Sequence, residues 1–245
     1  PGYLYLPKNS APPYQAIIYA HPGMGTRLPS PQPGEELLYD FLVKGGRAFF
    51  VPVIKGMYQR RFAAASSGLN MNRDRLIEQS KDFRRSIDYL MSRPDIDHDR
   101  LGVFGLSYFG SYVPVLAVGE RRLKAGVLGS TGVASSRSYF LPETDPLNFI
   151  PRFRIPTLMI NGRSDFGCPV EACQIPMLQL LGAPEQDKKL VHWDGGHFPA
   201  DGSIVRTETL AWFDRYLGPV SVRTALAESL NAATARLAAQ TGLDP

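Results

Sequence analysis

The segment Leu101-Gly-Val-Phe-Gly-Leu-Ser-Tyr-Phe-Gly110 carries the clearest structural signal in the sequence. Its apolar first half predicts a buried strand, and the residues after it predict a helix. Ser107 stands at the junction. A serine on such a sharp turn exposes its hydroxyl above the sheet, next to a helix N-terminus that favours negative charge. This placement is typical of a nucleophilic serine, whereas the alternative interpretation is a tight turn whose serine only caps the helix.

The residues around this serine follow the pattern of a nucleophile turn with one exception. Backbones come close at such a turn, so the positions two before and two after the serine are expected to be small. Gly105 satisfies the first position, but Phe109 occupies the second, and Gly110 comes one step later. We therefore expect the geometry of this turn to be altered.

Apolar segments alternate with amphipathic segments on both sides of this stretch. The expected strands are residues 15–21, 47–53, 100–104, 124–128, 156–160 and 188–193. The expected helices are residues 34–44, 72–91, 107–119, 170–181 and 203–217. Alternation at this pace predicts an α/β fold, with a mostly parallel central sheet covered by helices on both faces.

Two segments lie outside this alternation. Residues 130–154 show little periodicity, and an irregular insertion of that length in a compact domain is usually functional. Residues 220–245 carry apolar residues at helical spacing, so we expect a C-terminal helical extension that packs on the body or on a second subunit. The catalytic domain is expected to span residues 1–219.

Composition excludes several classes of protein. The 245 residues are 44% hydrophobic and 20% charged, which excludes a disordered, collagen-like or coiled-coil chain. A formal net charge of +4 is too small to argue for nucleic acid or a membrane surface. No run of about 18 apolar residues exists, so no membrane span is expected. The two cysteines cannot form a disulfide framework, and the absence of Cys/His zinc spacing predicts no metal.

A nucleophilic serine needs a base, and four histidines are available. His197 lies in Asp194-Gly-Gly-His-Phe198, a glycine-rich loop that lets the imidazole swing back over the carboxyl edge of the sheet. His98 is expected in a solvated turn, His192 packed within a strand, and His21 bracing the loop after the first long strand. His197 is therefore the candidate base.

The third member of a triad must orient the imidazole. Asp165 ends the segment Asn161-Gly-Arg-Ser-Asp165 after a predicted strand, where its carboxylate can accept a hydrogen bond from the histidine. The rival carboxylates are Asp145, Glu171 and Asp194. Asp145 lies in the irregular insertion, and Asp194 is too close to the histidine in the sequence to reach round the ring easily.

An oxyanion needs two preorganised N–H donors. The residue after the nucleophile, Tyr108, is expected to supply one of them. The loop His21-Pro-Gly-Met-Gly25 is expected to supply the other from Met24, with Gly23 as the alternative.

Together these motifs resemble the α/β-hydrolase superfamily over residues 14–220. The matching segments are Gly105-Leu-Ser-Tyr-Phe-Gly110, Asn161-Gly-Arg-Ser-Asp165, Gly196-His197 and His21-Pro-Gly-Met-Gly25, in the nucleophile–acid–base order of that superfamily. Within it, the chain is similar to the branch of dienelactone hydrolases, acetylxylan esterases and prolyl-oligopeptidase-like enzymes. More narrowly, Asp145-Pro-Leu-Asn-Phe149 and Phe213-Asp-Arg-Tyr-Leu-Gly-Pro219 look like hydrolase domains fused to some bacterial serine/threonine protein kinases.

The resemblance implies a serine carboxylesterase that acts on a small-molecule ester through an acyl-enzyme, without a cofactor. The alternatives are a prolyl-oligopeptidase-like serine peptidase and a non-catalytic sensor or interaction module with a hydrolase fold. The residues expected to bind substrate are aromatic: Phe109, Tyr139, Phe140, Phe166 and Phe198.

The sequence also gives expectations about partner chains and the cellular compartment. We expect that the C-terminal helix can join two copies of the chain. The chain begins at Pro1 and not at Met, so an upstream domain is an expectation, and a kinase would fit the resemblance. No signal peptide is visible, which favours the cytoplasm. No nucleic-acid partner is expected.

Overall fold

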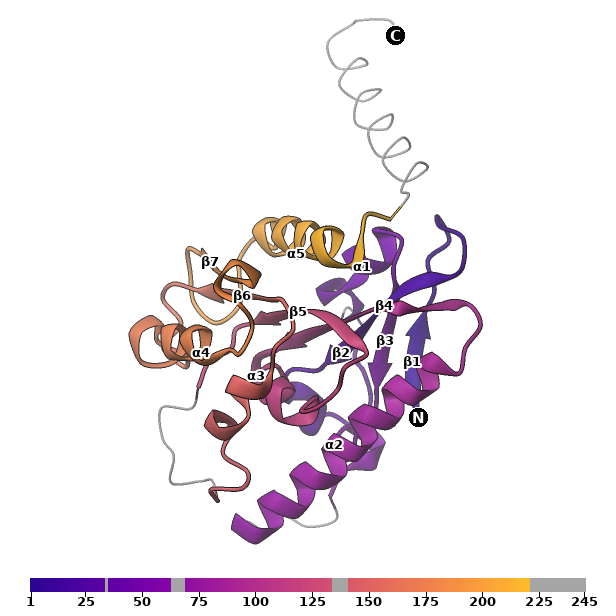
Figure 1. The fold of residues 1–245 in the computed structure, drawn as a ribbon. Coiled ribbons are helices and arrows are strands. Elements are labelled where there is room, and N and C mark those ends of the chain that lie inside the picture. The colour runs from indigo at the N-terminus through magenta and orange to yellow at the C-terminus, as the bar shows by residue number, and fades with distance from the viewer. Residues whose placement is uncertain (34, 63–68, 134–140, 221–245) are drawn as a thin grey trace, which may run out of the picture.

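The computed structural model describes residues 1–33, 35–62, 69–133 and 141–220. Within them, one seven-stranded sheet has the order β1-β3-β2-β4-β5-β6-β7, with helices on both faces (Figure 1). The strands are β1 (Gly2–Tyr5), β2 (Tyr14–Ala20), β3 (Ala48–Pro52), β4 (Ile96–Leu106), β5 (Leu123–Gly129), β6 (Thr157–Gly162) and β7 (Lys188–Trp193). β1 pairs antiparallel to β3, and the other pairs are parallel. The predicted α/β fold class is confirmed.

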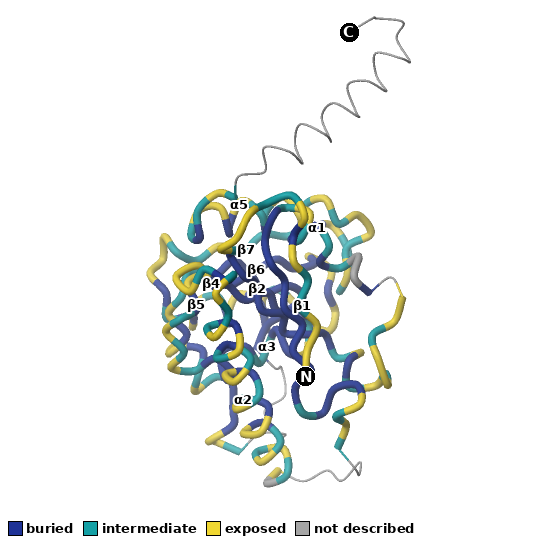
Figure 2. The backbone as a smooth tube through the Cα atoms, turned by 90° about the vertical axis from the view of Figure 1, so that its right-hand side faces the viewer, coloured by how far each residue is buried: buried dark blue, intermediate teal, exposed yellow. Residues whose placement is uncertain are grey.

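Two apolar layers cover the sheet. The helices are α1 (Asp40–Lys44), α2 (Leu69–Met91), α3 (Ser107–Leu116), α4 (Ile175–Leu180) and α5 (Ser203–Leu217). One core cluster joins the sheet to α2, α3 and α4, and the other joins it to α1 and α5. Figure 2 shows the buried strands lying between these layers. Both faces of each central strand are therefore apolar, as the near-continuous hydrophobic runs predict.

Several elements differ from expectation. β1 was not predicted, and it adds an antiparallel edge strand to the sheet. The helix expected over residues 34–44 is divided into a 3-10 turn, η2 (Glu35–Leu38), and α1. The segment expected as one helix over residues 170–181 begins as a π-helical turn, Val170–Gln174, before α4. Pro176 fits this change, because a proline lacks the N–H of a continuing helix and is tolerated in a first turn.

Some predictions fall on residues that the structure does not describe. The predicted C-terminal extension lies almost wholly in residues 221–245, and part of the predicted insertion lies in residues 134–140. The described part of that insertion contains two 3-10 turns, Pro146–Asn148 and Ile150–Arg152. Among the helices of the described ranges, none combines the length and the apolarity needed to cross a bilayer.

Strand register aligns the candidate residues at one edge of the sheet. Leu106 pairs with Gly129, so the residues that follow them, Ser107 and Ser130, are level with each other. Gly162 at the end of β6 pairs with Trp193 at the end of β7. The turns after β4, β5, β6 and β7 therefore meet at the carboxyl edge of the sheet, where ligands bind in open α/β folds.

Candidate active site

Ser107 lies on a sharp turn between β4 and α3. Its backbone is left-handed, with φ of 51°, a conformation that costs a non-glycine residue energy and that clusters at functional sites. Gly105 and Gly110 make the close approach at this turn. A Cβ at Gly105 would lie 2.8 Å from the Cα of Gly110, and a Cβ at Gly110 would lie 2.9 Å from the carbonyl carbon of Gly105. The small residue that the turn requires after Ser107 is therefore Gly110, three positions after the serine and not two.

Phe109 does not have the predicted role in lining the substrate site. None of its side chain is exposed, and it belongs to the core cluster between the sheet and α2, α3 and α4. The reason is helical geometry, because α3 begins at Ser107 and turns its next residues toward different neighbours. Phe109 turns into the core, while Gly110 faces the strand.

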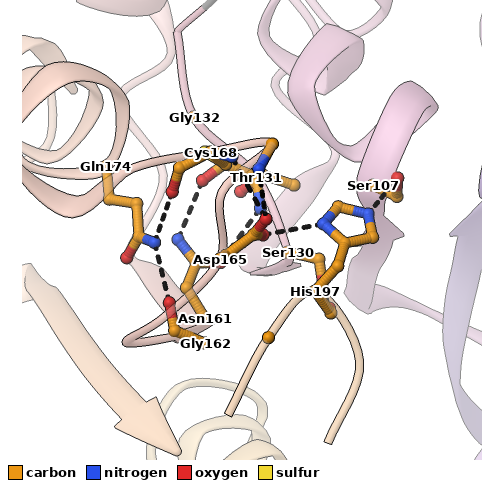
Figure 3. Close-up of polar contacts among 12 residues, drawn as sticks. Ser107, Ser130, Thr131, Gly132, Asn161, Gly162, Asp165, Cys168, Gln174 and His197 are labelled. Carbon is orange, nitrogen blue, oxygen red and sulfur yellow. Dashed lines mark hydrogen bonds and ion pairs between the residues drawn. The ribbon is translucent and has the colours of Figure 1, made fainter.

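The three residues of the predicted triad lie in one hydrogen-bonded chain (Figure 3). His197 Nε2 is 2.8 Å from the Ser107 hydroxyl oxygen, and His197 Nδ1 is 2.7 Å from Asp165 Oδ2. Since a carboxylate only accepts, Nδ1 carries the proton and Nε2 faces the serine as the acceptor. A base in this tautomer can take the proton of the serine hydroxyl.

The Asp165 carboxylate is fixed by its own loop. It is 2% exposed, and the backbone N–H groups of Gly167 and Cys168 donate to Oδ1 at 2.9 and 3.1 Å. Oδ2 remains directed at the histidine (Figure 3). The Gln174 amide ties the loop down by donating to the carbonyls of Gly162 and Cys168 at 3.0 and 2.7 Å. The charge of Asp165 is therefore satisfied on both oxygens before any substrate arrives.

The rival carboxylates have other roles. The Asp194 side chain is 99% exposed and lies 3.6 Å from Arg163. Asp145 caps the turn after it, since its carboxylate accepts from the backbone N–H of Leu147 at 3.0 Å. Glu171 is exposed on the turn before α4.

The loop that carries His197 is held by groups that sequence analysis missed. The Ser130 hydroxyl donates to the His197 carbonyl at 2.5 Å. The backbone of Ser130 is in the left-handed region, with φ of 53°. The Trp193 indole N–H donates to the Gly196 carbonyl at 3.0 Å. Gly162 lies so close to this loop that a Cβ there would come within 1.9 Å of the Gly196 carbonyl oxygen. The ends of β5, β6 and β7 thus all contact the loop that carries His197.

The predicted oxyanion loop lies beside the nucleophile turn. It forms the 3-10 turn η1 (Gly23–Thr26), and a Cβ at Gly23 would lie 3.4 Å from the Cβ of Tyr108. This close approach brings together the two backbone segments that are predicted to donate to an oxyanion. His21, at the start of the loop, is 1% exposed, and its Nδ1 donates to the Pro22 carbonyl at 2.7 Å.

A buried polar network holds this loop from behind. The Tyr58 hydroxyl lies 2.6 Å from His21 Nε2 and donates to Glu35 Oε1 at 2.7 Å, and Glu35 also contacts His21 Nε2. Burial alone would raise the pKa of Glu35, but the Tyr58 hydrogen bond and the nearby His21 outweigh it and lower that pKa. Burial, with Glu35 nearby, raises the pKa of Tyr58, which keeps it a hydroxyl donor. The sequence predicts that His21 braces this loop. It does not predict the contacts of Glu35 and Tyr58 with His21, because neither residue lies in a recognisable motif.

The other predicted substrate residues have different surroundings. Phe198 is 54% exposed, and its ring centroid lies 4.8 Å from that of His197. Phe166 is 91% exposed, so its ring projects into solvent. Tyr139 and Phe140 lie outside the described residues.

Neither metal nor thiol chemistry has a prepared position in the described ranges. No group of three or more His, Cys, Asp or Glu side chains gathers there in an arrangement that could hold a metal ion. Cys168 and Cys173 are free and buried. Burial raises the pKa of both thiols, which disfavours the reactive thiolate.

Known proteins match parts of this chain at low identity. No family model matches it. The protein YcjY of Escherichia coli (strain K12) is 26% identical over 123 residues, which cover 50% of this chain and 37% of that protein. Dipeptidyl-peptidase 5 of Porphyromonas gingivalis is 23% identical over 175 residues, which cover 57% of this chain and 25% of that protein. The chain thus spans well under half the length of these curated relatives.

Solved structures share the fold over most of the chain. A candidate dienelactone hydrolase from Klebsiella pneumoniae has a TM-score of 0.68 at 18% identity, covering 88% of this chain and 93% of its own. Acetyl xylan esterase 1 from Thermoanaerobacterium has a TM-score of 0.65 at 18% identity, and the match covers 86% of this chain and 77% of the esterase. The acylaminoacyl peptidase of Pyrococcus horikoshii has a TM-score of 0.61 at 17% identity, and the match covers 89% of this chain and 39% of the peptidase. The chain therefore has the α/β-hydrolase fold.

Proposed function

We propose that this protein is a serine hydrolase that cleaves carboxylic esters through an acyl-enzyme on Ser107. The observation that carries the proposal is the hydrogen-bonded chain of Ser107, His197 and Asp165, with links of 2.8 and 2.7 Å. Serine, imidazole and carboxylate in this order are the groups that acyl transfer by a serine nucleophile requires. The left-handed turn at Ser107 adds support, because it aims the hydroxyl out of the sheet.

The proposed reaction has two halves. Ser107 attacks the ester carbonyl while His197 Nε2 takes the hydroxyl proton, and the Asp165 carboxylate stabilises the imidazolium. The bond between the carbonyl carbon and the alcohol oxygen then breaks, and His197 gives its proton to the departing alcohol. The acyl group stays on Ser107 as an ester. Water deprotonated by His197 attacks that ester in the second half, and Ser107 regains its proton from the imidazolium. Every proton transfer uses a residue of this chain, so the proposal needs no cofactor or metal.

The oxyanion is assigned to two backbone N–H groups. We place one on Tyr108, in the first turn of α3, where helix N–H groups have no intrahelical acceptor. We place the other on Met24 in η1, which the contact between Gly23 and Tyr108 brings alongside. Such preorganised donors typically contribute about 2.7–4 kcal/mol each to the transition state.

A peptidase is the second candidate function. Dipeptidyl-peptidase 5 and the acylaminoacyl peptidase are among the proteins that this chain resembles. Ester cleavage is preferred because the acetyl xylan esterase matches over most of its own length, whereas this chain covers only 39% of the acylaminoacyl peptidase.

The test is a panel of 4-nitrophenyl esters from acetate to palmitate, run beside an aminoacyl 4-nitroanilide on wild type and on Ser107→Ala. We expect ester turnover, and a fall in kcat/KM of at least about a thousand-fold in Ser107→Ala. Faster cleavage of the anilide than of every ester would establish the peptidase instead. Equal ester turnover by wild type and Ser107→Ala would refute both, and a wild type inert on both substrate types would favour a non-catalytic module.

A further inference from the structure

A cavity of about 280 Å³ lies on the face of the sheet covered by α1 and α5. Its walls include residues bonded directly to the candidate catalytic residues: Leu106 precedes Ser107, and Phe198 follows His197. Ser130, which holds the carbonyl of His197, also lines it. The cavity therefore borders the candidate active site through Ser130, Leu106 and Phe198.

Most of the remaining wall residues are apolar. Leu38 lines the cavity from the segment after the oxyanion loop, Phe104 and Ile160 line it from the sheet, and Val205 lines it from α5. A lining of aliphatic and aromatic side chains is what small-molecule sites present to the apolar part of a ligand. The cavity thus presents a largely apolar surface next to the loop that carries His197.

Two of the polar side chains on the lining, those of Ser130 and Trp193, already make hydrogen bonds. The Ser130 hydroxyl donates to the His197 carbonyl, and the Trp193 indole N–H donates to the Gly196 carbonyl. Arg206 lies 3.7 Å from Asp201, and both are partly exposed. A ligand group in the cavity therefore finds few uncommitted side-chain partners for hydrogen bonds or charge. A polar or charged group there would lose its water without replacement, which costs free energy.

We propose that this cavity receives an unbranched apolar acyl chain, so that the substrates are esters of medium-chain fatty acids. The proposal rests on the function proposed above and specifies its substrate class. We infer that a chain esterified to Ser107 enters from this side, since Leu106, the residue before Ser107, forms part of the cavity wall. It stays attached through the second half of the reaction, when the alcohol has already gone.

The volume sets the length of the chain. The cavity lies just below the range of about 300–1,000 Å³ that holds drug-sized ligands. A hexanoyl or octanoyl chain suits such a space, whereas a palmitoyl chain extends beyond it. Each methylene that enters should raise kcat/KM by up to about fourfold, which corresponds to about 0.8 kcal/mol.

The experiment measures kcat/KM for 4-nitrophenyl acetate, hexanoate, octanoate and palmitate on wild type and two variants. Val205→Trp places a large ring in the cavity from α5. Thr207→Trp is the matched control, because Thr207 is exposed on the same helix and does not line the cavity. We expect wild type to prefer octanoate to acetate and palmitate. Val205→Trp should lower the octanoate-to-acetate ratio at least about tenfold, and Thr207→Trp should leave it within twofold.

An unchanged ratio in Val205→Trp, or a wild type without preference for octanoate, would overturn the proposal. A parallel series of alkyl acetates tests the alcohol side. If Val205→Trp changes the preference for the alcohol instead of the acyl chain, the proposal is also overturned. Labelling of Ser107 by a fluorophosphonate probe separates the two levels of inference. Labelled protein without the chain-length effect refutes the cavity assignment alone, whereas protein that neither labels nor hydrolyses acetate refutes the proposed function and the cavity assignment together.

Discussion

Ser130 donates a hydrogen bond of 2.5 Å from its hydroxyl to the backbone carbonyl of His197. Ser130 is level with Ser107 across the β4–β5 pair, and the two serines have nearly the same left-handed φ, 53° and 51°. One serine contacts the imidazole and the other contacts the backbone of the same histidine (Figure 3). Strained residues of this kind persist only where their surroundings enforce them. The pair therefore fixes both the position and the direction of the candidate base.

Ser130→Ala should lower kcat, because it removes the hydrogen bond that holds the backbone of the candidate base His197. A hydrogen bond of this kind contributes about 0.5–1.5 kcal/mol, so the expected loss is roughly two- to thirteenfold. Steady-state kinetics on a 4-nitrophenyl ester measure it. Ser86→Ala is the control, since Ser86 makes the same type of bond to the Asp82 carbonyl, within α2, at 2.8 Å. Full kcat in Ser130→Ala would show that the loop needs no such clamp.

Asp165→Asn should lower kcat by about ten-thousand-fold. The N–H groups of Gly167 and Cys168 hold one oxygen of the side chain, so the new amide NH₂ would face His197 Nδ1. That group donates, which moves the imidazole proton to Nε2 and leaves no acceptor for the serine hydroxyl. Rates are compared with Asp194→Asn, which alters an exposed carboxylate and should keep wild-type kcat. Similar rates in the two variants would contradict the role given to Asp165.

Gly110→Ala should destabilise the protein by about 1–3 kcal/mol, because the added methyl overpacks the nucleophile turn. It would lie 2.6 Å from Thr131 Cγ2 and 2.9 Å from the carbonyl carbon of Gly105. Urea unfolding measures the change. Gly126→Ala on β5 is the control, since its nearest neighbours would lie at 3.4 Å, an ordinary contact. Equal stability of the two variants would show that the turn widens freely.

Glu35→Gln should remove a pH-dependent part of the stability. The pKa of Glu35 is lowered in the fold, where the Tyr58 hydrogen bond and His21 outweigh the opposing effect of burial. A carboxyl with a depressed folded pKa stabilises the fold above its unfolded pKa, about 4.3 for glutamate, and this contribution is lost as the pH falls through the folded value. The stability difference between wild type and Glu35→Gln should therefore be largest at neutral pH and shrink below about pH 4.

Urea unfolding across that pH range measures the difference in unfolding free energy. Glu171→Gln, which changes an exposed carboxyl, serves as the control. A difference between wild type and Glu35→Gln that stays constant from neutral to acid pH would contradict the linkage.

Local motifs made Ser107, Asp165 and His197 predictable. Each follows a strand of the central sheet, and parallel strands bring their carboxyl ends to one edge. The geometry of the structure brings the three together as expected. Their catalytic roles stay predictions until they are measured.

Other parts of the site carry no local signal. Ser130 meets His197 across 67 residues, and Tyr58 meets Glu35 across 23, through register and loop packing alone. Phe109, which the sequence predicts at the substrate site, is buried in the core, and Gly110 makes the close contact that the spacing rule expects two positions after the serine. Such contacts depend on how whole segments pack, which no short motif encodes.

The proposed function depends on Ser107 acting as a nucleophile that His197 activates. The most direct measurement is mass spectrometry of the protein after reaction with a fluorophosphonate probe, with the modified peptide sequenced. We predict a single adduct on Ser107 that disappears in Ser107→Ala and forms much more slowly in His197→Ala. A wild-type protein that stays unmodified, or an adduct that forms at the same rate in Ser107→Ala, would contradict the account.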